Sequence, residues 1–380
     1  MQSEHPNFTP LLDTETLEPS DVVCPFYSPQ FFNALHLAGC TGVEQGWQAA
    51  HFNYQQWILP GYFKQHSYGE YIFDWSIAQA VEQAGVNYYP KWVCQFPFTP
   101  ISMSQPAFLR KQMPAQQQPT SLAELVAELL EQLAKRNVLT AQFLYPHASL
   151  AKQLAPLMLT RHSIQFYWQN QNYRDFKDYL DGLKQKRAKD VRRERRKVSE
   201  MGIECRWLNA EELTADAIKR FIPFYQRTYL KRSGHAGYLN QDFFLKWLLT
   251  FRDRVHLVEA LKSGETVACA LFIESNDELY GRYYGSYCET DFLHFEICYY
   301  QAIEYAIARK FTRVNPGVQG EHKVRRGFAP ELTPSYYRYF NSSLERSIAA
   351  AFQQETRELR QYLNYLNQRL PFKTSALSGD

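Results

Sequence analysis

The sequence predicts a mixed α/β (α+β) fold of two lobes, each a mostly antiparallel sheet flanked by helices. Its 380 residues exceed what one hydrophobic core usually holds. Segments with helical periodicity alternate with segments of strand periodicity along the chain. Three strand-like segments follow closely at 255–260, 266–273 and 279–287, with Gly264 and Asn276-Asp277 between them. This spacing predicts an antiparallel meander.

Composition is typical of a globular protein, with 45% hydrophobic and 21% charged residues. No apolar run is long enough to cross a bilayer, and the first residues lack the layout of a signal peptide. The seven cysteines are scattered without a Cys-x-x-Cys pair, which favours buried, reduced thiols over disulfides or a zinc site. We therefore expect a cytoplasmic protein without a membrane span and without a bound metal.

In the first half, residues 1–20 are predicted to be a loose lead-in, and 104–119 a Gln- and Pro-rich loop. The segment Trp57–Lys64 is predicted as one strand, with Pro60 at an edge or bulge. A second strand is expected at 88–96. Ser121-x-x-Glu124 predicts a capping box that opens an amphipathic helix.

The second half is predicted to begin with a strand at 164–168 and one long helix from about 173 to 201. The third meander strand should present Tyr280, Arg282, Tyr284 and Ser286 on one face, because side chains alternate along a strand. A helix is expected from about 292 to 310. Ser342-x-x-Glu345 predicts the cap of a final helix.

The predicted long helix is strongly basic. Between Lys184 and Lys197 there are nine Lys or Arg residues and two acidic residues. A solvated helix face explains such a run in many proteins. Like charges four residues apart repel each other, however, so an anionic partner such as a nucleic-acid phosphate is the other interpretation. Its candidate contacts are Arg192, Arg193, Arg195 and Arg196.

The stretch from Val314 to Phe328 combines glycines and a proline with an acid, an imidazole and three cations. Glycine bends the backbone and allows close approach to a ligand. A polar loop between two apolar elements often carries a functional site. A solvated surface turn is the alternative interpretation.

Several motifs together resemble one family of bacterial N-acyltransferases, the FemAB-like or peptidoglycan biosynthesis/recognition proteins. In the first half these are His66-Ser67-Tyr68-Gly69-Glu70-Tyr71, Phe73-Asp74-Trp75, Tyr89-Pro90-Lys91 and Pro97-Phe98-Thr99-Pro100. In the second half they are Leu279-Tyr280-Gly281-Arg282, Leu293-His294-Phe295-Glu296, Cys298-Tyr299-Tyr300-Gln301 and Gln319-Gly320-Glu321-His322-Lys323. The resemblance covers about residues 20–350.

This resemblance implies two lobes similar to GNAT acyltransferases. They would be an N-terminal lobe at 20–155 and a C-terminal acyltransferase lobe at 156–345, followed by a C-terminal helix at 342–370 and a flexible tail at 371–380. Lys323-Val324-Arg325-Arg326-Gly327-Phe328 is similar to a loop of the wider Fem group, which transfers amino acids from aminoacyl-tRNA to peptide amines. The phosphate loop of acetyl-CoA enzymes is not found before the long helix. Acyl-CoA and aminoacyl-tRNA both stay candidate donors, and tRNA a candidate partner.

N-acyl transfer needs a deprotonated amine, a nearby activated carbonyl and donors for the developing oxyanion. The candidate catalytic residues are Glu321, His322, Lys323 and Glu296. The candidate substrate-binding residues are His66, Glu70, Asp74, Lys91, Arg282, His294 and Arg326. The sequence leaves open which residue is the general base, because Glu321, His322 and Glu296 all qualify.

Two functions follow from these patterns. One is an N-acyltransferase that joins an activated acyl or aminoacyl group to an amine acceptor, such as a peptidoglycan precursor or a peptide. The other is a non-catalytic protein that binds RNA or a cell-wall precursor through the basic helix and an aromatic cleft. No Gly-x-Ser-x-Gly elbow or His-Glu-x-x-His motif occurs, so neither a covalent nucleophile nor a zinc centre is indicated.

Overall fold

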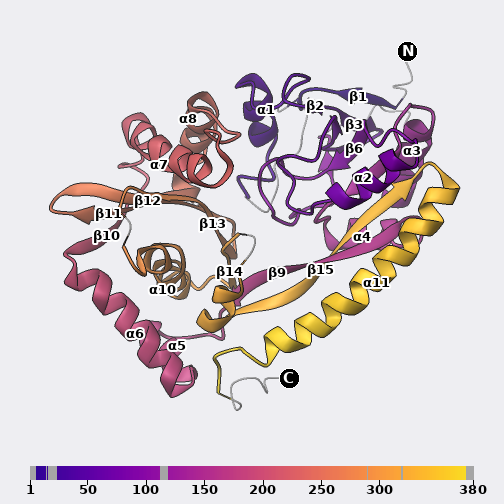
Figure 1. Ribbon diagram of the computed structural model, residues 1–380. Coiled ribbons are helices and arrows are strands. Elements are labelled where there is room, and N and C mark those ends of the chain that lie inside the picture. The colour runs from indigo at the N-terminus through magenta and orange to yellow at the C-terminus, as the bar shows by residue number, and fades with distance from the viewer. Residues whose placement is uncertain are drawn as a thin grey trace. The chain divides into compact units, whose positions relative to one another are not determined.

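A computed structural model describes residues 6–13, 15, 24–111, 119–288, 290–317 and 320–373 (Figure 1). Most of the expected lead-in, residues 112–118 of the expected Gln- and Pro-rich loop, Val318, Gln319 and residues 374–380 of the expected tail lie outside this description.

The chain divides into two compact units. Unit 1 comprises residues 1–164 and 332–361, and unit 2 comprises residues 165–331 and 362–380. The lobes expected from the sequence, 20–155 and 156–345, differ from this division because residues 332–361 return to unit 1. Each unit therefore consists of two stretches that are far apart in the sequence.

The strands of unit 1 belong to two sheets, one of four strands and one of eleven strands that also includes the strands of unit 2. Its elements are β1 (Asn7–Thr9), α1 (Pro29–Leu37), β2 (Trp47–Ala49), β3 (His51–Tyr54), β4 (Trp57–Leu59), β5 (Tyr62–Lys64), α2 (Trp75–Gln83), β6 (Lys91–Cys94), β7 (Phe108–Leu109), α3 (Leu122–Ala134), β8 (Thr140–Phe143) and α4 (Ala148–Leu154). Strands β1, β3, β4 and β7 form one sheet, in that order. In the other, β2, β5 and β6 are antiparallel neighbours, β6 and β8 are parallel, and β8 pairs with β15 (Phe328–Tyr339).

Unit 2 is built on the meander. Its elements are β9 (Leu159–Gln169, begun in unit 1), α5 (Phe176–Gly182), α6 (Gln185–Glu200), β10 (Ile203–Trp207), α7 (Ala215–Ser233), α8 (Gln241–Thr250), β11 (Val255–Lys262), β12 (Glu265–Glu274), β13 (Glu278–Ser286), α9 (Leu293–Phe295), the π-helix η2 (Glu296–Tyr300), α10 (Gln301–Ala308), β14 (Arg313–Asn315) and the 3₁₀ turn η3 (Glu321–Arg326). Helix α11 (Ser342–Asn367) begins in unit 1 and ends in unit 2.

Strands β10 to β13 form an antiparallel meander, and β13 continues the sheet through a parallel pairing with β14. Helices α7 and α8 cover one face of this sheet and α10 covers the other (Figure 1). Helix α7 lies so close to β13 that a Cβ at Gly285 would be 1.8 Å from the Phe224 carbonyl oxygen. The mixed α/β fold with mostly antiparallel sheets and flanking helices is therefore confirmed.

The predicted strand Trp57–Lys64 is wrong as a single element. Pro60 and Gly61 separate β4 from β5, and the two short strands join different sheets. Proline cannot donate a ladder hydrogen bond, which explains why the chain changes sheet there. The capping box at Ser121 and Glu124 is confirmed, with the Ser121 hydroxyl accepting from the Glu124 N–H at 3.2 Å.

The predicted long helix is also wrong, because the chain breaks at Leu183 between α5 and α6. Leu183 has an extended conformation with ψ of 154°, and its side chain is buried. Helix α5 ends at Gly182, a residue with low helix propensity. A buried anchor at Leu183 thus fixes a break that periodicity alone does not reveal.

Strand β13 does not present all of its predicted residues on one face, which were Tyr280, Arg282, Tyr284 and Ser286. A β-bulge places Tyr283 as an extra residue, with φ of 56°. Arg282 then pairs with Leu271, whereas Tyr284 pairs with Ala270. Because successive residues of β12 point to opposite faces, Arg282 and Tyr284 do so too. The predicted shared face is therefore wrong.

The cap of α11 is Asn341 and not the predicted Ser342. The Asn341 side-chain oxygen accepts hydrogen bonds from the N–H groups of Ser343 at 3.1 Å and Leu344 at 3.2 Å.

We expect Asn341→Ala to lower the free energy of unfolding by about 1 kcal/mol. Ser342→Ala, the matched control, should leave it unchanged. Urea unfolding of both variants measures this, and equal effects would contradict Asn341 as the cap.

Candidate functional site

The glycines of the 314–328 stretch set the shape of turn η3. Gly317, Gly320 and Gly327 all have positive φ, at 81°, 113° and 80°. A Cβ on Gly320 would lie 2.2 Å from the His322 ring. Only glycine therefore lets the chain fold back so that His322 lies against the start of its own turn.

His322 is joined to Tyr299 of the π-helix η2. Its Nε2 lies 2.8 Å from the Tyr299 hydroxyl. Although the residue has an exposed side, partial removal of the ring from water lowers the pKa of His322 to about 4, and the cations Lys323, Arg326 and Arg232 lower it further. The ring is consequently neutral at pH 7, and its hydrogen bond to Tyr299 fixes its orientation.

Lys323 is a buried lysine on turn η3. Only 2% of the residue is exposed, and its Nζ donates to the Gly317 carbonyl at 2.5 Å. Burial lowers the pKa of Lys323 to about 7, assisted by the positive charge of Arg282 and opposed by Cys298. Among the described residues no carboxylate forms an ion pair with this ammonium. At neutral pH the group is thus present in both protonation states.

Arg282 lies beside this lysine and is held by β14. Its Nη2 donates to the Asn315 side-chain oxygen at 3.2 Å, and its Nη1 lies 3.3 Å from the Asn315 carbonyl. The bulge at Tyr283 and the parallel pairing of β13 with β14 together fix this guanidinium. Sequence reasoning missed Asn315, whose position before Pro316 gave no functional signal.

Arg326 is held by a buried ion pair with Glu194 of α6. Its Nη2 lies 2.8 Å and 3.0 Å from the two carboxylate oxygens, and its Nε donates to the Tyr300 hydroxyl at 2.8 Å. The guanidinium also lies 3.5 Å from the centre of the Phe295 ring. These contacts satisfy its charge within the protein, so Arg326 anchors η3 to α6.

The two acids predicted to be catalytic, Glu296 and Glu321, also accept hydrogen bonds from other side chains. Glu296 accepts from Arg195 at 3.1 Å and from Gln301 at 2.9 Å. Glu321 is exposed and accepts a hydrogen bond from the Tyr362 hydroxyl. His294 packs edge-on against Tyr299 with ring centres 5.2 Å apart, and burial chiefly lowers its pKa to about 3. The structure thus gathers His294, His322 and Lys323, whereas Glu296 belongs to an ion pair with α6.

Three of the predicted residues of unit 1, Glu70, Asp74 and Lys91, form a separate, fully buried network. Lys91 of β6 contacts Glu70 at 2.9 Å and Asp74 at 2.6 Å. Sequence reasoning missed Lys64 of β5, which lies 3.3 Å from Glu70 and 3.2 Å from the centre of the Trp47 ring. Two ammonium groups thus balance two carboxylates, as a buried network requires.

The pKa values of this network depend on the partners. Burial opposes ionisation of Asp74, but Lys91 and hydrogen bonds from Lys91, Ser67 and Tyr88 outweigh it and lower the pKa to about 2. For Lys64, burial lowers the pKa to about 7 against the attraction of Glu70. Outside the network, His66 is partly exposed, with Nε2 3.0 Å from the Gln45 carbonyl. Substrate recognition by His66, Glu70, Asp74 and Lys91 stays a prediction.

The arginines of the basic helix α6 have acidic neighbours within unit 2. Arg195 is bound by Glu296 and Glu304, Arg193 by Asp190, Arg192 by Asp181 and Arg196 by Glu200. Arg195 is the least exposed of them. The exposed pairs contribute little to stability and exchange readily with other anions. A nucleic-acid contact at these residues therefore stays a prediction.

Within the described parts of the chain, no helix combines the length and apolar character needed to cross a membrane. The same residues contain no group of three or more His, Cys, Asp or Glu side chains arranged to hold a metal ion.

Three solved structures illustrate what the chain is similar to. The C-terminal domain (DUF2156) of a putative lysylphosphatidylglycerol synthetase from Agrobacterium fabrum has a TM-score of 0.47 at 10% identity, covering 87% of this chain and 92% of that one. FemX has a TM-score of 0.46 at 12% identity, covering 82% and 93%. A tandem GNAT protein from the clavulanic acid biosynthesis pathway has a TM-score of 0.38 at 8% identity, covering 82% and 88%.

No curated protein is close enough in sequence to count as a relative. Residues 15–374, however, match the sequence pattern of the FemAB-like family, which is described as peptidoglycan biosynthesis/recognition. The match spans both units and includes all the motifs quoted above. The chain belongs to the FemAB-like family of peptidoglycan biosynthesis/recognition proteins.

Proposed function

We propose that the protein is an N-acyltransferase that moves an activated acyl or aminoacyl group to the amine of a peptidoglycan precursor. Family membership supports the choice of acceptor class. The observation that carries the reaction type is Lys323, a buried amine without a carboxylate partner among the described residues. Its pKa of about 7 suits a group that must accept and return a proton at neutral pH.

The proposed step uses Lys323 first as a base and then as an acid. The acceptor amine attacks the carbonyl carbon of the donor ester or thioester, forming a C–N bond. Neutral Lys323 takes the proton that the amine loses. The C–O bond of an aminoacyl-tRNA, or the C–S bond of an acyl-CoA, then breaks, and the Lys323 ammonium gives that proton to the leaving oxygen or sulfur. The products are an amide and an alcohol or a thiol, so atoms and charge balance.

The other residues of the site have supporting roles in this proposal. Arg282 keeps the pKa of Lys323 low through its nearby positive charge. In this proposal, the positive charge of the ammonium formed during the step stabilises the developing oxyanion. His322, which is neutral and oriented by Tyr299, is proposed to accept a hydrogen bond from the acceptor amine through its other ring nitrogen. Arg326 is proposed to position this turn through its bond to the His322 carbonyl at 2.9 Å.

The test is direct formation of the amide. The full chain is incubated with an aminoacyl-tRNA or an acyl-CoA as donor and a UDP-linked muropeptide carrying a free amine as acceptor. We expect mass spectrometry to detect the acyl-muropeptide with at least one donor class. If no donor gives product while thermal shifts show that the acceptor binds, the protein is a recognition protein and the proposal is wrong.

His322→Gln is expected to lower the transfer rate about 10²-fold, because the ring nitrogen proposed to bind the amine is lost. The fold should persist, since the residue has an exposed side. His162→Gln is the matched control: His162 also bonds a hydroxyl, that of Thr356 at 3.1 Å, but lies in unit 1. Initial rates at saturating donor measure both variants, and equal rates would remove His322 from the site.

A further inference from the structure

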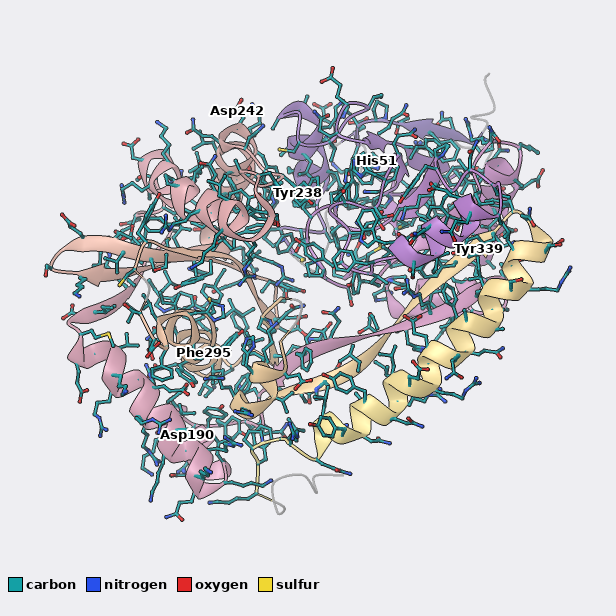
Figure 2. The ribbon with its side chains drawn as sticks, viewed as in Figure 1. His51, Asp190, Tyr238, Asp242, Phe295 and Tyr339 are labelled. Atoms are coloured by element: carbon teal, nitrogen blue, oxygen red, sulfur yellow. The ribbon has the colours of Figure 1, made fainter. Side chains whose placement is uncertain are left out.

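A cavity lies in unit 2 beside turn η3. Its volume is about 690 Å³, and it is lined by residues of α6 and η3, by Phe295 and Tyr300, and by Leu366, Gln368, Arg369, Leu370 and Pro371 near the end of α11. Two of its lining residues, Asp190 and Phe295, are labelled in Figure 2. Lys323 does not line it, although its neighbours His322 and Val324 do. We call it the C-terminal cavity. Its volume is that of a typical small-molecule site.

The lining of the C-terminal cavity has a surplus of positive charge. Six cationic side chains and three carboxylates face it. Two of the carboxylates are already committed: Asp190 lies 3.4 Å from Arg187 and 3.2 Å from Arg193, and Glu194 is bound by Arg326. The third, Glu321, accepts from Tyr362. The protein's own acids therefore leave part of this positive charge unbalanced.

The unbalanced charge belongs to three exposed side chains, those of Lys184, Arg325 and Arg369. Among the described residues, the Arg325 side chain makes no hydrogen bond or ion pair, and the Arg369 guanidinium lies 4.3 Å from the centre of the Tyr365 ring. Lys184 donates to the Leu370 carbonyl at 3.2 Å, which places its ammonium at the cavity wall. Two guanidinium groups and an ammonium around one cavity are the donors that bind phosphate most strongly in proteins.

The remaining wall is apolar. Val191, Val324, Leu366, Leu370 and Pro371 line it, and all five are buried. A fully hydrated inorganic anion would leave this surface without a partner. A ligand with a phosphate at one end and a compact apolar or ring-shaped part at the other would satisfy both halves of the lining.

We propose that the C-terminal cavity binds a small organic phosphate. Arg325 and Arg369 hold the phosphate, Lys184 adds a third positive charge, and the apolar wall contacts the organic part. Phosphate binding there does not depend on the acyl-transfer chemistry proposed for Lys323, although His322 also lines the cavity. It shares turn η3 with that site, since Arg325 and Lys323 lie on the same turn.

The proposal is tested by isothermal titration of the full chain with phenyl phosphate, inorganic phosphate and phenol at constant ionic strength. We expect phenyl phosphate to bind more tightly than inorganic phosphate, and phenol not to bind. Arg325→Gln and Arg369→Gln should each weaken phenyl phosphate about tenfold, the loss typical of one hydrogen bond to a charged group. Arg196→Gln, an exposed arginine of α6 that does not line the cavity, should have no effect.

Each other outcome overturns the proposal. Equal weakening by Arg196→Gln would mean diffuse attraction to the basic helix. Equal affinity for phenyl phosphate and inorganic phosphate would mean that the apolar wall does not contact the organic part of the ligand. Absence of binding in the wild-type chain would exclude the site. Because binding is measured without turnover, a failure here is independent of whether acyl transfer is detected.

Discussion

Replacing Lys323 with methionine is expected to lower acyl transfer about 10²- to 10³-fold while leaving the fold intact. Methionine has nearly the length of lysine and no proton to exchange, so the proposed base and acid are both removed. The measurement is the initial rate of amide formation at pH 7. Lys262→Met, an exposed lysine at the end of β11, is the matched control and should retain the wild-type rate.

The same variant should be more stable than the wild type at neutral pH. The unfolded chain keeps Lys323 protonated up to about pH 10, whereas the folded protein releases that proton near pH 7. The unfolded state therefore binds more protons between these values, and wild-type stability rises with pH across this range. The lowering from 10.5 to about 7 sets an upper limit of about 5 kcal/mol for the gain at or below pH 7.

Urea unfolding of Lys323→Met and wild type at pH 7 and pH 9.5 checks this expectation. The stability difference should be larger at pH 7 and shrink as the pH rises. An inactive variant that is also more stable cannot owe its inactivity to misfolding. A variant that is inactive and less stable at both pH values would mean that Lys323 acts only as a structural residue.

Lys91→Met is expected to destabilise unit 1 by about 3–5 kcal/mol, because Asp74 and Glu70 would keep a buried, unbalanced negative charge. The measurement is the midpoint of thermal or urea unfolding. Adding Asp74→Asn to Lys91→Met restores charge balance with Lys64 and should recover part of the loss. A double variant no more stable than the single one would contradict this account.

Lys135→Met provides a matched control for burial. Lys135 lies 2.6 Å from Glu131, the same distance as Lys91 from Asp74, but its side chain is 60% exposed. Water already solvates that pair, so its loss should change stability little. Similar effects of Lys91→Met and Lys135→Met would show that burial does not set the importance of the network.

The pH dependence of the same network has a definite sign. The folded-state pKa of Asp74 is about 2, below its ordinary value of 3.8. Its contribution to stability is therefore fully present above 3.8 and is lost as the pH falls through about 2. Between these two pH values, acid lowers the free energy of unfolding of the wild type partly because Asp74 becomes protonated. Asp74→Asn has no carboxylate at this position, so its free energy of unfolding should fall less over the same pH range.

The fold class could be predicted because the signals that specify it are local. The meander has short turns, so its three strands are neighbours in sequence as well as in space. The cap at Ser121 acts within three residues, and so does Asn240, which caps α8 by accepting from the Phe243 N–H. The Tyr283 bulge and the break at Leu183 gave no such signal, because a partner strand and a buried side chain fix them.

The candidate site was predicted only in part. The glycine and cation pattern of 314–328 pointed to turn η3, and His322 and Lys323 lie on it. The sequence did not indicate that Glu194 binds Arg326 across 132 positions, or that Tyr299 orients His322. Glu194 stood out only as one of two acids in a basic run, and Tyr299 only as part of a motif that carries the family resemblance.

By itself, the sequence determined the family, the mixed α/β class and the stretch that carries Lys323, because motifs, periodicity and glycine positions are properties of neighbouring residues. Only the tertiary structure decided which charges have partners. Arg326 and Lys323 lie three positions apart on one turn, yet the first is bound by Glu194 and the second faces a carbonyl with Arg282 nearby. Burial and the distance to opposite charge control a pKa, and both are set by segments far apart in the chain.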